Sequence, residues 1–529
     1  MPRFEHAIRG IQFFNLDKIT YHKTMVTIVD LDISVAGRPT GLISRVNHLQ
    51  IASRYDGHHT FDLQVLLSRT DTVDLSEIEA HLGEPIEIRY SWSSGASSVF
   101  RGFIDEIIPS WTADGGRVLA LKGWSPTLFL DCGPAFRCFS ETTLDVVLNK
   151  ILAPYRRYFP RLNIGPKASQ KIRWSVQANE TDFQYLCRLA DQSGVQEMWY
   201  DGDCLHFDDL TSPTSDDDIC LVKGEGLHSL SLSLNTAPLS FSVKTYDFVN
   251  GAYPEAQAGP MTSTIPLINA ALKKSEAYPA QRIFLPYPME GNRGLQPLIR
   301  RFASKQAHEL LVLTGQSNDP RLLIGSKITI DTRDDMLETE LSGQFVVIRA
   351  NHQISKNGQY ENGFTAVPIS HPYNLRMTSG RGPVCGPMAA EVVDCNDPER
   401  IGRVKVRFLA DELKATSPWL RCLTPYTSKG GVFQMPHKHE HVMVLGEDFN
   451  LEHGGFVLNA FFHKNSRANK WDPAKERGIR YEGAGMLFTR EKVNTWADTV
   501  QTNARRECSS DAPKIYLNCQ KGAIPDKNV

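Results

Sequence analysis

Cysteine is scarce in this 529-residue chain, which has ten cysteines and no C-x-x-C pair or Cys/His spacing typical of a zinc site. Disulfide scaffolds carry about 8–10% cysteine, so reduced core cysteines are expected instead. Long apolar runs are also lacking, because no stretch reaches the roughly 18 consecutive residues of a spanning helix. The first residues, MPRFEHAIRG, lack a basic segment followed by an apolar one. We therefore expect neither a signal peptide nor stable membrane insertion.

An excess of one charge is lacking as well, since 58 basic residues face 60 acidic ones and the formal net charge is −2. Such a balance provides no global field that would attract phosphate or an anionic membrane. The sequence also lacks a P-loop, a G-x-G-x-x-G after a strand, a G-x-S-x-G elbow and an EF-hand loop. None of these motifs therefore supports an enzymatic activity or a cofactor.

Most of the sequence has the alternating pattern of β-strands. Segments such as TFDLQVLL and EPIEIRYSW, between residues 20 and 130, are rich in β-branched and aromatic residues. Apolar residues at helical spacing predict a helix from about 144 to 155, and Thr181 and Gln184 form a capping box before another. A third helix-like stretch covers 297–315. The sequence predicts a mainly β fold with a small α/β segment.

Two segments, residues 82–126 and 324–368, have the same order of features. Each begins with a strand that follows a glycine, continues through a variable loop into a long strand, and passes a glycine turn before a final strand that ends near a proline. Hairpins resemble one another by composition, which leaves chance likeness as the alternative. We interpret the two segments as copies of one β-barrel motif.

A Gly/Pro-rich joint, TSGRGPVCGPM at 378–388, marks the clearest domain boundary. Five short strand-like runs follow it up to residue 465, which favours an OB-type barrel. The expected domains are a first β-barrel at 1–134, an α/β insertion at 135–226, a second β-barrel at 227–377, an OB-fold barrel at 378–465 and a short tail or needle stub at 466–529.

The stretch ERIGRVKVRF, residues 399–408, alternates cations with apolar residues. A period of two directs the apolar side chains into a core and the cations towards water or another subunit. The apolar residues are Val404, Val406 and Phe408, and the cations of this basic stripe are Arg403, Lys405 and Arg407. Barrels that bind nucleic acid interleave aromatic residues with such cations, and the stripe has none. An OB-type nucleic-acid-binding protein is therefore kept only as an alternative.

Three histidines, His437, His439 and His441, occur in PHKHEHVMVL at i, i+2 and i+4. On one face of a strand they would converge as ligands for Zn²⁺ or a similar metal. Met443 stands where H-E-x-x-H requires its second histidine, which excludes that protease motif. A metal-binding protein is thus a second alternative. Acids also gather in GDCLHFDDL, a pattern shared by Ca²⁺ loops and, far more often, by solvated turns.

The chain resembles the VgrG spike proteins of type VI secretion systems, and the related hub and spike proteins of contractile phage tails, over about residues 15–465. WSVQANETDFQYLCRLADQSGV is similar to the family's signature of a strand, an E-T/S-D-F cap and an R-L helix. NDPRLLIGSKITI is similar to its strand entry and GQYENGFTAVP to the close of its second barrel. In the OB segment, the matching positions are Gly402, Arg403, Val404, Trp419 and Arg421.

The resemblance implies two β-barrels of tail-hub type, then an OB barrel, in a homotrimeric structural protein. Such a trimer adapts a threefold spike to a sixfold tube and punctures the target envelope. The implied partners are a hexameric Hcp-like tube protein, baseplate components, a PAAR-like tip protein and effectors, without nucleic acid. Assembly in the cytoplasm and secretion by contraction, without a signal peptide, are expected. Interface candidates are Arg403, Lys405, Arg407, Trp419 and Arg421, with Asp411 and Glu412 as nearby carboxylates.

The chain departs from the family pattern in two places. Many members have Arg-x-Gly-Asp/Glu-Glu-Val before the fourth OB strand, where this chain has the residues 437–441, so the local chemistry is expected to differ. The long triple-stranded needle with its Val/Gly-rich repeat is missing, since about 45 residues follow Gly485. They have room for only a few strands of about 5–6 residues. We expect a stubby spike, a tip completed by a partner, or a shortened chain.

Overall fold

A computed structural model describes two compact units, Met1–Phe461 and Phe462–Val529. In the described part of the chain no helix is long and apolar enough to cross a membrane. The described residues are 26–39, 45–67, 79–92, 95–111, 116–165, 171–193, 197–208, 218–285, 310–332, 343–369, 384–427 and 432–468, with short pieces between 295 and 307 and between 472 and 497.

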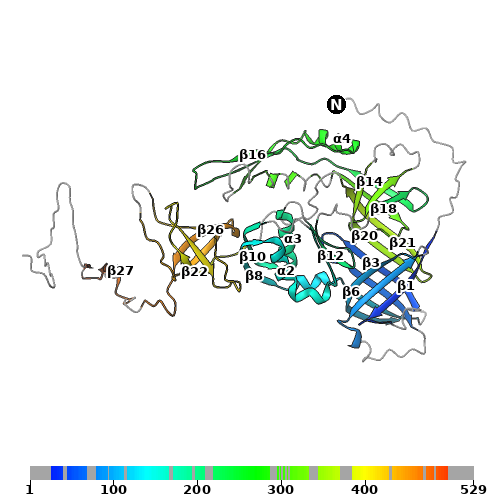
Figure 1. The fold of residues 1–529 in the computed structure, drawn as a ribbon, viewed down its shortest axis with the longest axis horizontal. Helices are drawn as coiled ribbons and strands as arrows, with labels where there is room; N and C mark the ends of the chain where they lie inside the picture. The colour runs from blue at the N-terminus through cyan, green and yellow to red at the C-terminus, as the bar shows by residue number, and fades with distance from the viewer. Residues whose placement is uncertain are drawn as a thin grey trace, which may run out of the picture. The chain divides into compact units, whose positions relative to one another are not determined.

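The predicted repeat forms two matching antiparallel meanders (Figure 1). The first meander consists of β5 (Pro85–Trp92), β6 (Ser97–Trp111) and β7 (Arg117–Trp124), and the second of β19 (Lys327–Asp331), β20 (Phe345–Ser355) and β21 (Gln359–Pro368). In each, the first strand pairs with the second and the second with the third. The prediction that the two segments share one motif is confirmed.

The likeness extends to the backbone hydrogen bonds. Gly83 and Gly325 have φ values of +82° and +86°, a region that favours glycine. The Gly83 amide donates to the carbonyl of Ile104 over 2.8 Å, and the Gly325 amide donates to that of Val347 over 2.9 Å. A β-bulge follows at once in both copies, after Ile104 and after Val347. Ile104 and Val347 are therefore equivalent positions, which sets the register of the comparison.

All of these strands belong to one 13-stranded sheet, in which β20 and β21 of the second barrel also pair with strands of the first barrel. Six strands run in the order β3-β4-β7-β6-β5-β1, and the hairpin of β20 and β21 connects their ends by pairing β20 with β3 and β21 with β1. Eight strands thus form a closed ring. The remaining bounds are β1 (Thr27–Val35), β2 (Arg38–Pro39), β3 (Val46–Arg54), β4 (Thr60–Leu67), β13 (Ile219–Val222), β14 (Leu227–Leu234) and β18 (Leu311–Ser317).

The ring has a continuous apolar core because each strand alternates inward apolar residues with outward polar ones. In β4, for example, Phe61, Leu63 and Val65 are buried. Ile354 and Tyr360 of the second meander belong to the same core. The predicted boundaries at 134 and 227 stay predictions, although the hydrogen bonding of the two barrels crosses between them.

The α/β segment begins with a 3₁₀ turn, η2 (Pro126–Asp131), and its helices confirm the predicted faces. Leu144, Val147, Leu148, Ile151 and Leu152 of α2 (Leu144–Leu152) are all buried. The helix is shorter than predicted because a 3₁₀ turn that opens with a proline, η3 (Ala153–Tyr158), replaces its last turn. The strands are β8 (Pro134–Thr143), β9 (Arg161–Ile164), β10 (Lys171–Thr181), β11 (Glu197–Tyr200) and β12 (Cys204–Asp208).

The capping box before α3 (Asp182–Ser193) is confirmed. The Thr181 amide donates to Gln184 Oε1 over 3.3 Å, and the Gln184 amide donates to Thr181 Oγ1 over 3.2 Å. Phe183, Leu186, Cys187 and Ala190 line the buried face of the helix. Gly194, expected as its end, lies outside the described residues.

An arm is inserted between β14 and β18 of the second barrel. It contains β15 (Phe241–Thr245), β16 (Glu255–Gln257), β17 (Gln281–Leu285) and α4 (Pro266–Ser275). The helix predicted at 297–315 is confirmed in part, because the described pieces between 295 and 307 are helical. Its last turn is wrong, since Leu311 begins β18, where alternating Leu311 and Leu313 enter the core.

The C-terminal part of the first unit is the predicted OB-type barrel of five strands. They close in the order β22-β23-β24-β26-β25 around the inward face of β23, with Val404, Val406 and Phe408 buried. The bounds are β22 (Met388–Asp394), β23 (Arg403–Phe408), β24 (Leu420–Cys422), β25 (His441–Glu447) and β26 (Asn450–Ala460).

In the second unit, the described strands form one antiparallel sheet. Its order is β27-β28-β29, with bounds β27 (Arg477–Tyr481), β28 (Ala484–Phe488) and β29 (Val493–Trp496). The rest of the predicted tail, residues 498–529, lies outside the described residues.

Candidate functional site

The basic stripe on β23 is only partly a wet face, because Arg403 is buried with 8% of its surface exposed. Its Nη2 lies 2.6 Å and its Nε 3.1 Å from Oδ1 of Asp397. The expectation that all three cations face water is therefore wrong for Arg403. A buried guanidinium needs such a partner, and the turn before β23 provides it from within the chain.

Lys405 and Arg407, the other two cations of the stripe, are partly buried. Lys405 Nζ lies 5.0 Å from the centre of the Trp419 ring, and Arg403 Cζ lies 6.0 Å from it. Arg407 Nε donates to the carbonyl of Lys414 over 3.0 Å. Trp419 thus packs against the stripe as a structural neighbour. The role of these residues in a contact between chains stays a prediction.

Arg421 lies directly opposite Arg403 across β23 and β24. Its guanidinium lies between the rings of Phe248 and Phe456, 4.1 Å from each centre, and pairs with Glu447. Burial raises the pKa of Glu447, and the Arg421 charge opposes this shift. Phe248 comes from the turn after β15, so the arm covers this interface candidate within the chain.

The three histidines do not share the face of a strand, because β25 begins only at His441. His439 lies in the preceding turn with φ +72°, and its Nδ1 is 2.7 Å from Oε1 of Glu391. The arrangement expected for a metal site is therefore wrong. Among the described residues no group of three His, Cys, Asp or Glu side chains is placed to hold a metal ion.

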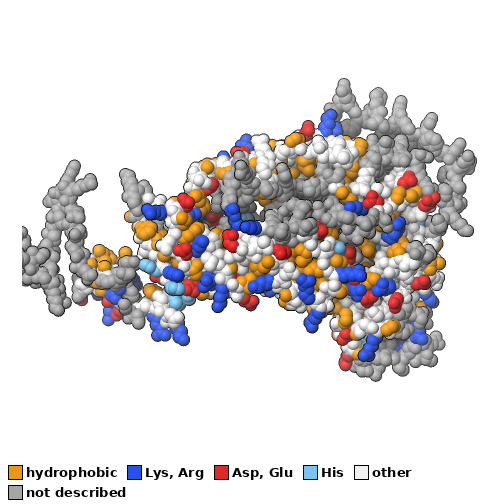
Figure 2. Space-filling model, in the orientation of Figure 1, with side chains coloured by type: hydrophobic (Ala, Val, Ile, Leu, Met, Phe, Trp, Pro, Cys, Tyr) orange, Lys and Arg blue, Asp and Glu red, His pale blue; other side chains and the backbone are white. Residues whose placement is uncertain are grey.

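The face of the described residues that Figure 2 shows mixes both signs of charge without a large field of one sign. Histidine side chains gather on the OB barrel beside Lys and Arg side chains. A nucleic-acid groove requires a continuous positive track. The mixed surface and the internal partners of Arg403 and Arg407 do not favour that alternative.

A buried ion-pair network joins the α/β segment to the OB barrel. Arg188 of α3 pairs with Glu180 through two hydrogen bonds of 2.8 Å, and its Nη1 lies 3.4 Å from Oε2 of Glu452 on β26. Glu452 also accepts the amide of Val176 over 2.6 Å. Burial raises the pKa of Glu452, and Arg188 opposes the shift. Removal of one partner would leave a buried charge unpaired, which is strongly destabilising. Each residue of this network is therefore needed for a stable joint.

Further contacts complete this joint. Trp174 Nε1 donates to the carbonyl of Leu451 over 3.0 Å, and Asp411 accepts the amide of Cys138 over 3.0 Å. Asp411 also accepts the amides of Leu413 and Ala415. Contrary to the expectation, it therefore does not neutralise the basic stripe. The sequence contained one signal for this joint: Glu180 and Arg188 are two of the three charged residues of the E-T-D-F and R-L signature. Their partner Glu452 had none.

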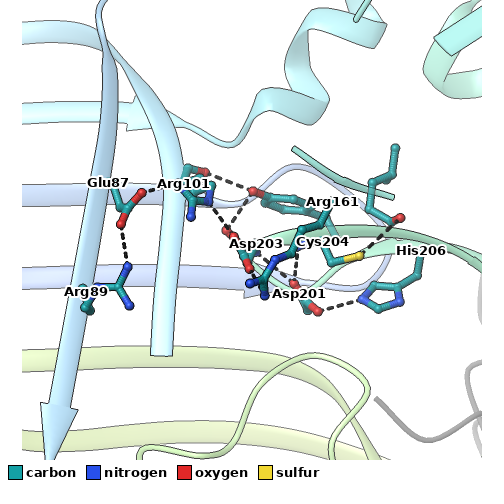
Figure 3. Close-up of polar contacts among 11 residues, drawn as sticks. Glu87, Arg89, Arg101, Arg161, Asp201, Asp203, Cys204 and His206 are labelled. Carbon is teal, nitrogen blue, oxygen red and sulfur yellow. Dashed lines mark hydrogen bonds and ion pairs between the residues drawn. The ribbon is translucent and has the colours of Figure 1, made fainter. Parts of the chain in front are cut away.

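A second network joins the first meander to the α/β segment (Figure 3). Arg101 of β6 lies 2.5 Å from Oδ1 of Asp203 and also pairs with Glu87, and Arg161 lies 2.7 Å from Oδ2 of Asp203. Although burial opposes it, a 2.7 Å contact with Asp201 raises the pKa of His206 to about 9. Asp203 of GDCLHFDDL thus forms ion pairs in this joint.

One arrangement resembles the hydroxyl, imidazole and carboxylate of a hydrolase. His58 lies 2.9 Å from Thr127 Oγ1 and 3.2 Å from Asp131 Oδ2. Thr127 is 1% exposed, so protein covers its hydroxyl, which a nucleophile must present to a substrate. Asp131 also accepts a hydrogen bond from Thr181 of the capping box. The arrangement therefore holds η2 against the start of α3.

Two comparisons concern sequence. Residues 388–462 match the type VI secretion system/phage-baseplate injector OB domain. The type VI secretion system spike protein VgrG5 of Pseudomonas aeruginosa is 25% identical over 423 residues, covering 70% of this chain and 50% of that protein. The chain thus spans about half the length of the curated relative it matches.

Solved structures show the same fold at low identity. The c3393 protein of E. coli, a component of the type VI secretion system, has 13% identity and a TM-score of 0.53, covering 81% of this chain and 99% of that one. A chain of a lidless PdpA-VgrG complex has 9% identity and a TM-score of 0.55, covering 89% of this chain and 94% of that one.

The longest match covers the first meander, two of the three strands of the second, and the joint between the first meander and the α/β segment. Residues 56–358 match the phage tail baseplate hub family, GPD. These residues hold five of the eight strands of the ring, the α/β segment and the arm, and the five strands are β4, β5, β6, β7 and β20. The chain therefore belongs to the phage tail baseplate hub family.

Proposed function

We propose that the chain is the structural spike hub of a contractile injection machine and acts as a homotrimer. Two like barrels in each of three chains would present six similar surfaces to a hexameric tube, and three OB barrels would narrow the particle towards a spike that punctures an envelope. The observation that carries this proposal is the repeated meander, with its equivalent glycine, bulge and pairing.

The joints support a mechanical role for the first unit. The α/β segment is tied to the first meander through Arg101 and Asp203, and to the OB barrel through Arg188 and Glu452. A force applied at the OB barrel would pass through buried ion pairs and hydrogen bonds to the hub barrels. In this proposal no catalytic step is needed, and contraction exports a protein assembled in the cytoplasm.

The partners follow from the same proposal. A hexameric tube protein and baseplate components would contact the hub ring, and a tip protein and effectors would complete the spike. The Francisella PdpA-VgrG complex is a solved example of a VgrG protein in complex with another protein.

Mass measurement and imaging test the proposal together. Light scattering after size exclusion at micromolar concentration should give three times the 59.3 kDa of one chain. Averaged electron images down the particle axis should show six similar lobes in a ring. A monomer, or a trimer whose ring shows only three lobes, would contradict the proposed adapter. Incubation with the cognate tube protein should place the ring at one end of a tube.

A further inference from the structure

The outer faces of the two meanders occupy equivalent positions but have different surroundings. In the second barrel, three outward residues in neighbouring strands are Val312, Ile348 and Val367. Trp199 of β11 packs on them and is 1% exposed. The α/β segment of the same chain therefore covers this face, and the covering side chain is Trp199 on the short strand β11.

The equivalent face of the first barrel is covered only in part, by Phe129 of η2, whose ring stacks on that of Phe103 at 4.4 Å. The register of the bulges makes Asp105 equivalent to Ile348 and Trp124 equivalent to Val367, and Thr60 pairs with Trp124 in the neighbouring strand. These residues line a groove of about 340 Å³ that runs over β3, β4, β7 and β6. No described segment fills it in the way that Trp199 fills its counterpart.

The groove is acidic, with Asp62, Asp105 and Glu106 against one cation, Lys122. Lys122 Nζ is 3.8 Å from Glu106, and Trp124 Nε1 donates to Asp105 over 3.3 Å. Oδ1 of Asp62 is removed from solvent and has no hydrogen-bond partner among the described residues. Because the acids outnumber the cation, a positively charged ligand would meet complementary charge in the groove.

The spacing of the acids restricts the ligand. Because the described residues hold no group of three acids placed for one metal ion, the charges suit a wider cation. A guanidinium offers several donors in one plane, binds carboxylates through two hydrogen bonds and stacks on aromatic rings. The indole of Trp124 borders the same groove as Asp62 and Asp105.

We propose that this groove is the docking site for an arginine-bearing extended segment of a partner protein. The arginine lies on Trp124 and donates to Asp62 and Asp105, in the place that Trp199 occupies on the second barrel. The site is separate from the basic stripe and from the contacts of the OB barrel. It therefore goes beyond the proposed hub function and does not depend on trimer formation.

A labelled peptide tests this assignment. The probe is fluorescein-Arg-Thr-Arg-Val-Arg-amide, with Glu-Thr-Glu-Val-Glu as its counterpart, and anisotropy is measured with the full chain at 50 and 150 mM salt. We expect the arginine peptide to bind and the glutamate peptide not to bind. The double variant Asp62→Asn/Asp105→Asn, which keeps the shape of both side chains, should weaken binding about tenfold or more.

Glu361→Gln supplies the matched control, because Glu361 is an exposed acid of the same sheet that does not line the groove. It should leave binding unchanged, and circular dichroism should confirm that all variants fold. The proposal is overturned by absence of binding to the wild-type chain, by equal binding to the double variant, or by equal weakening in Glu361→Gln, which would indicate general charge attraction. Trp124→Phe should reduce affinity less than the double variant, since a ring remains for stacking.

Discussion

The first and second meanders have one backbone plan and different side chains. Both keep the glycine before the first strand and the bulge in the second, which define the path of the chain. Where the paths are equivalent, however, Gly123 of the first meander stands in place of Ala366 of the second. The comparison teaches that the shared geometry resides in turns and bulges, while each copy adjusts its packing.

The largest expected effect comes from exchanging these two residues. A Cβ at Gly123 would lie 1.9 Å from the carbonyl oxygen of Phe103, so Gly123→Ala must displace backbone and should cost more than about 3 kcal/mol or prevent folding. Ala366→Gly removes one buried methyl group and should cost about 1 kcal/mol. Denaturant midpoints measure both, and equal losses would show that the positions are not distinguished by packing.

Removal of Trp199 should come next in size. Trp199→Ala leaves a cavity on the outer face of the second barrel and should cost about 3–5 kcal/mol. Trp199→Phe is the matched control and should cost much less, because the buried Nε1 has no hydrogen-bond partner among the described residues. Hydrogen exchange should locate the loss in β18 and β21. A loss located in β4 and β7 instead would contradict the assignment of faces.

Acid should destabilise the folded chain through two buried histidines, His59 and His352. Burial lowers the pKa of His59 to about 3 and that of His352 to about 4, so the unfolded chain binds protons below pH 6.5 that the folded chain does not. Stability should therefore fall as pH drops from 6.5 towards 4, by about 2 kcal/mol for each histidine at pH 5. His352 packs on Tyr90 and Tyr360 inside the ring.

The reverse dependence is expected for His206, whose pKa is raised to about 9. Its contribution is complete below pH 6.5 and is lost as pH rises towards 9. Denaturation midpoints between pH 4.5 and 9.5 for the wild type, His352→Phe and His206→Gln separate the two effects. If His352→Phe loses stability with falling pH as steeply as the wild type, the buried imidazole of His352 does not cause that loss.

The smallest effect tests how alike the two copies are. Gly83→Ala and Gly325→Ala each place a side chain at positive φ, which costs about 1–2 kcal/mol. The two variants should shift the thermal midpoint by the same amount within error. A clear difference between them would show that one glycine has a role besides its backbone conformation.

Local features of this fold could be predicted from the sequence because they repeat at short range. The capping box at Thr181, the buried face of α2 and the inward residues of β23 all follow from periods of two and 3.6. The pairing of β20 with β3 and of Arg188 with Glu452 could not be predicted, since partners distant in the sequence leave no periodic trace. The burial of Arg403 was missed because alternation alone places every second residue of a strand outside.

The ring of eight strands also constrains how the protein is made. A ribosome that has released β7, which ends at Trp124, must still synthesise the chain up to β20 at Phe345 before the ring can close. At bacterial or eukaryotic speeds of about 5–20 residues per second, that interval lasts on the order of 10 to 40 s. Throughout it the edges of β1 and β3 lack their final neighbours, and unpaired edges invite aggregation. The nascent chain therefore exposes these two edges until its own later hairpin arrives.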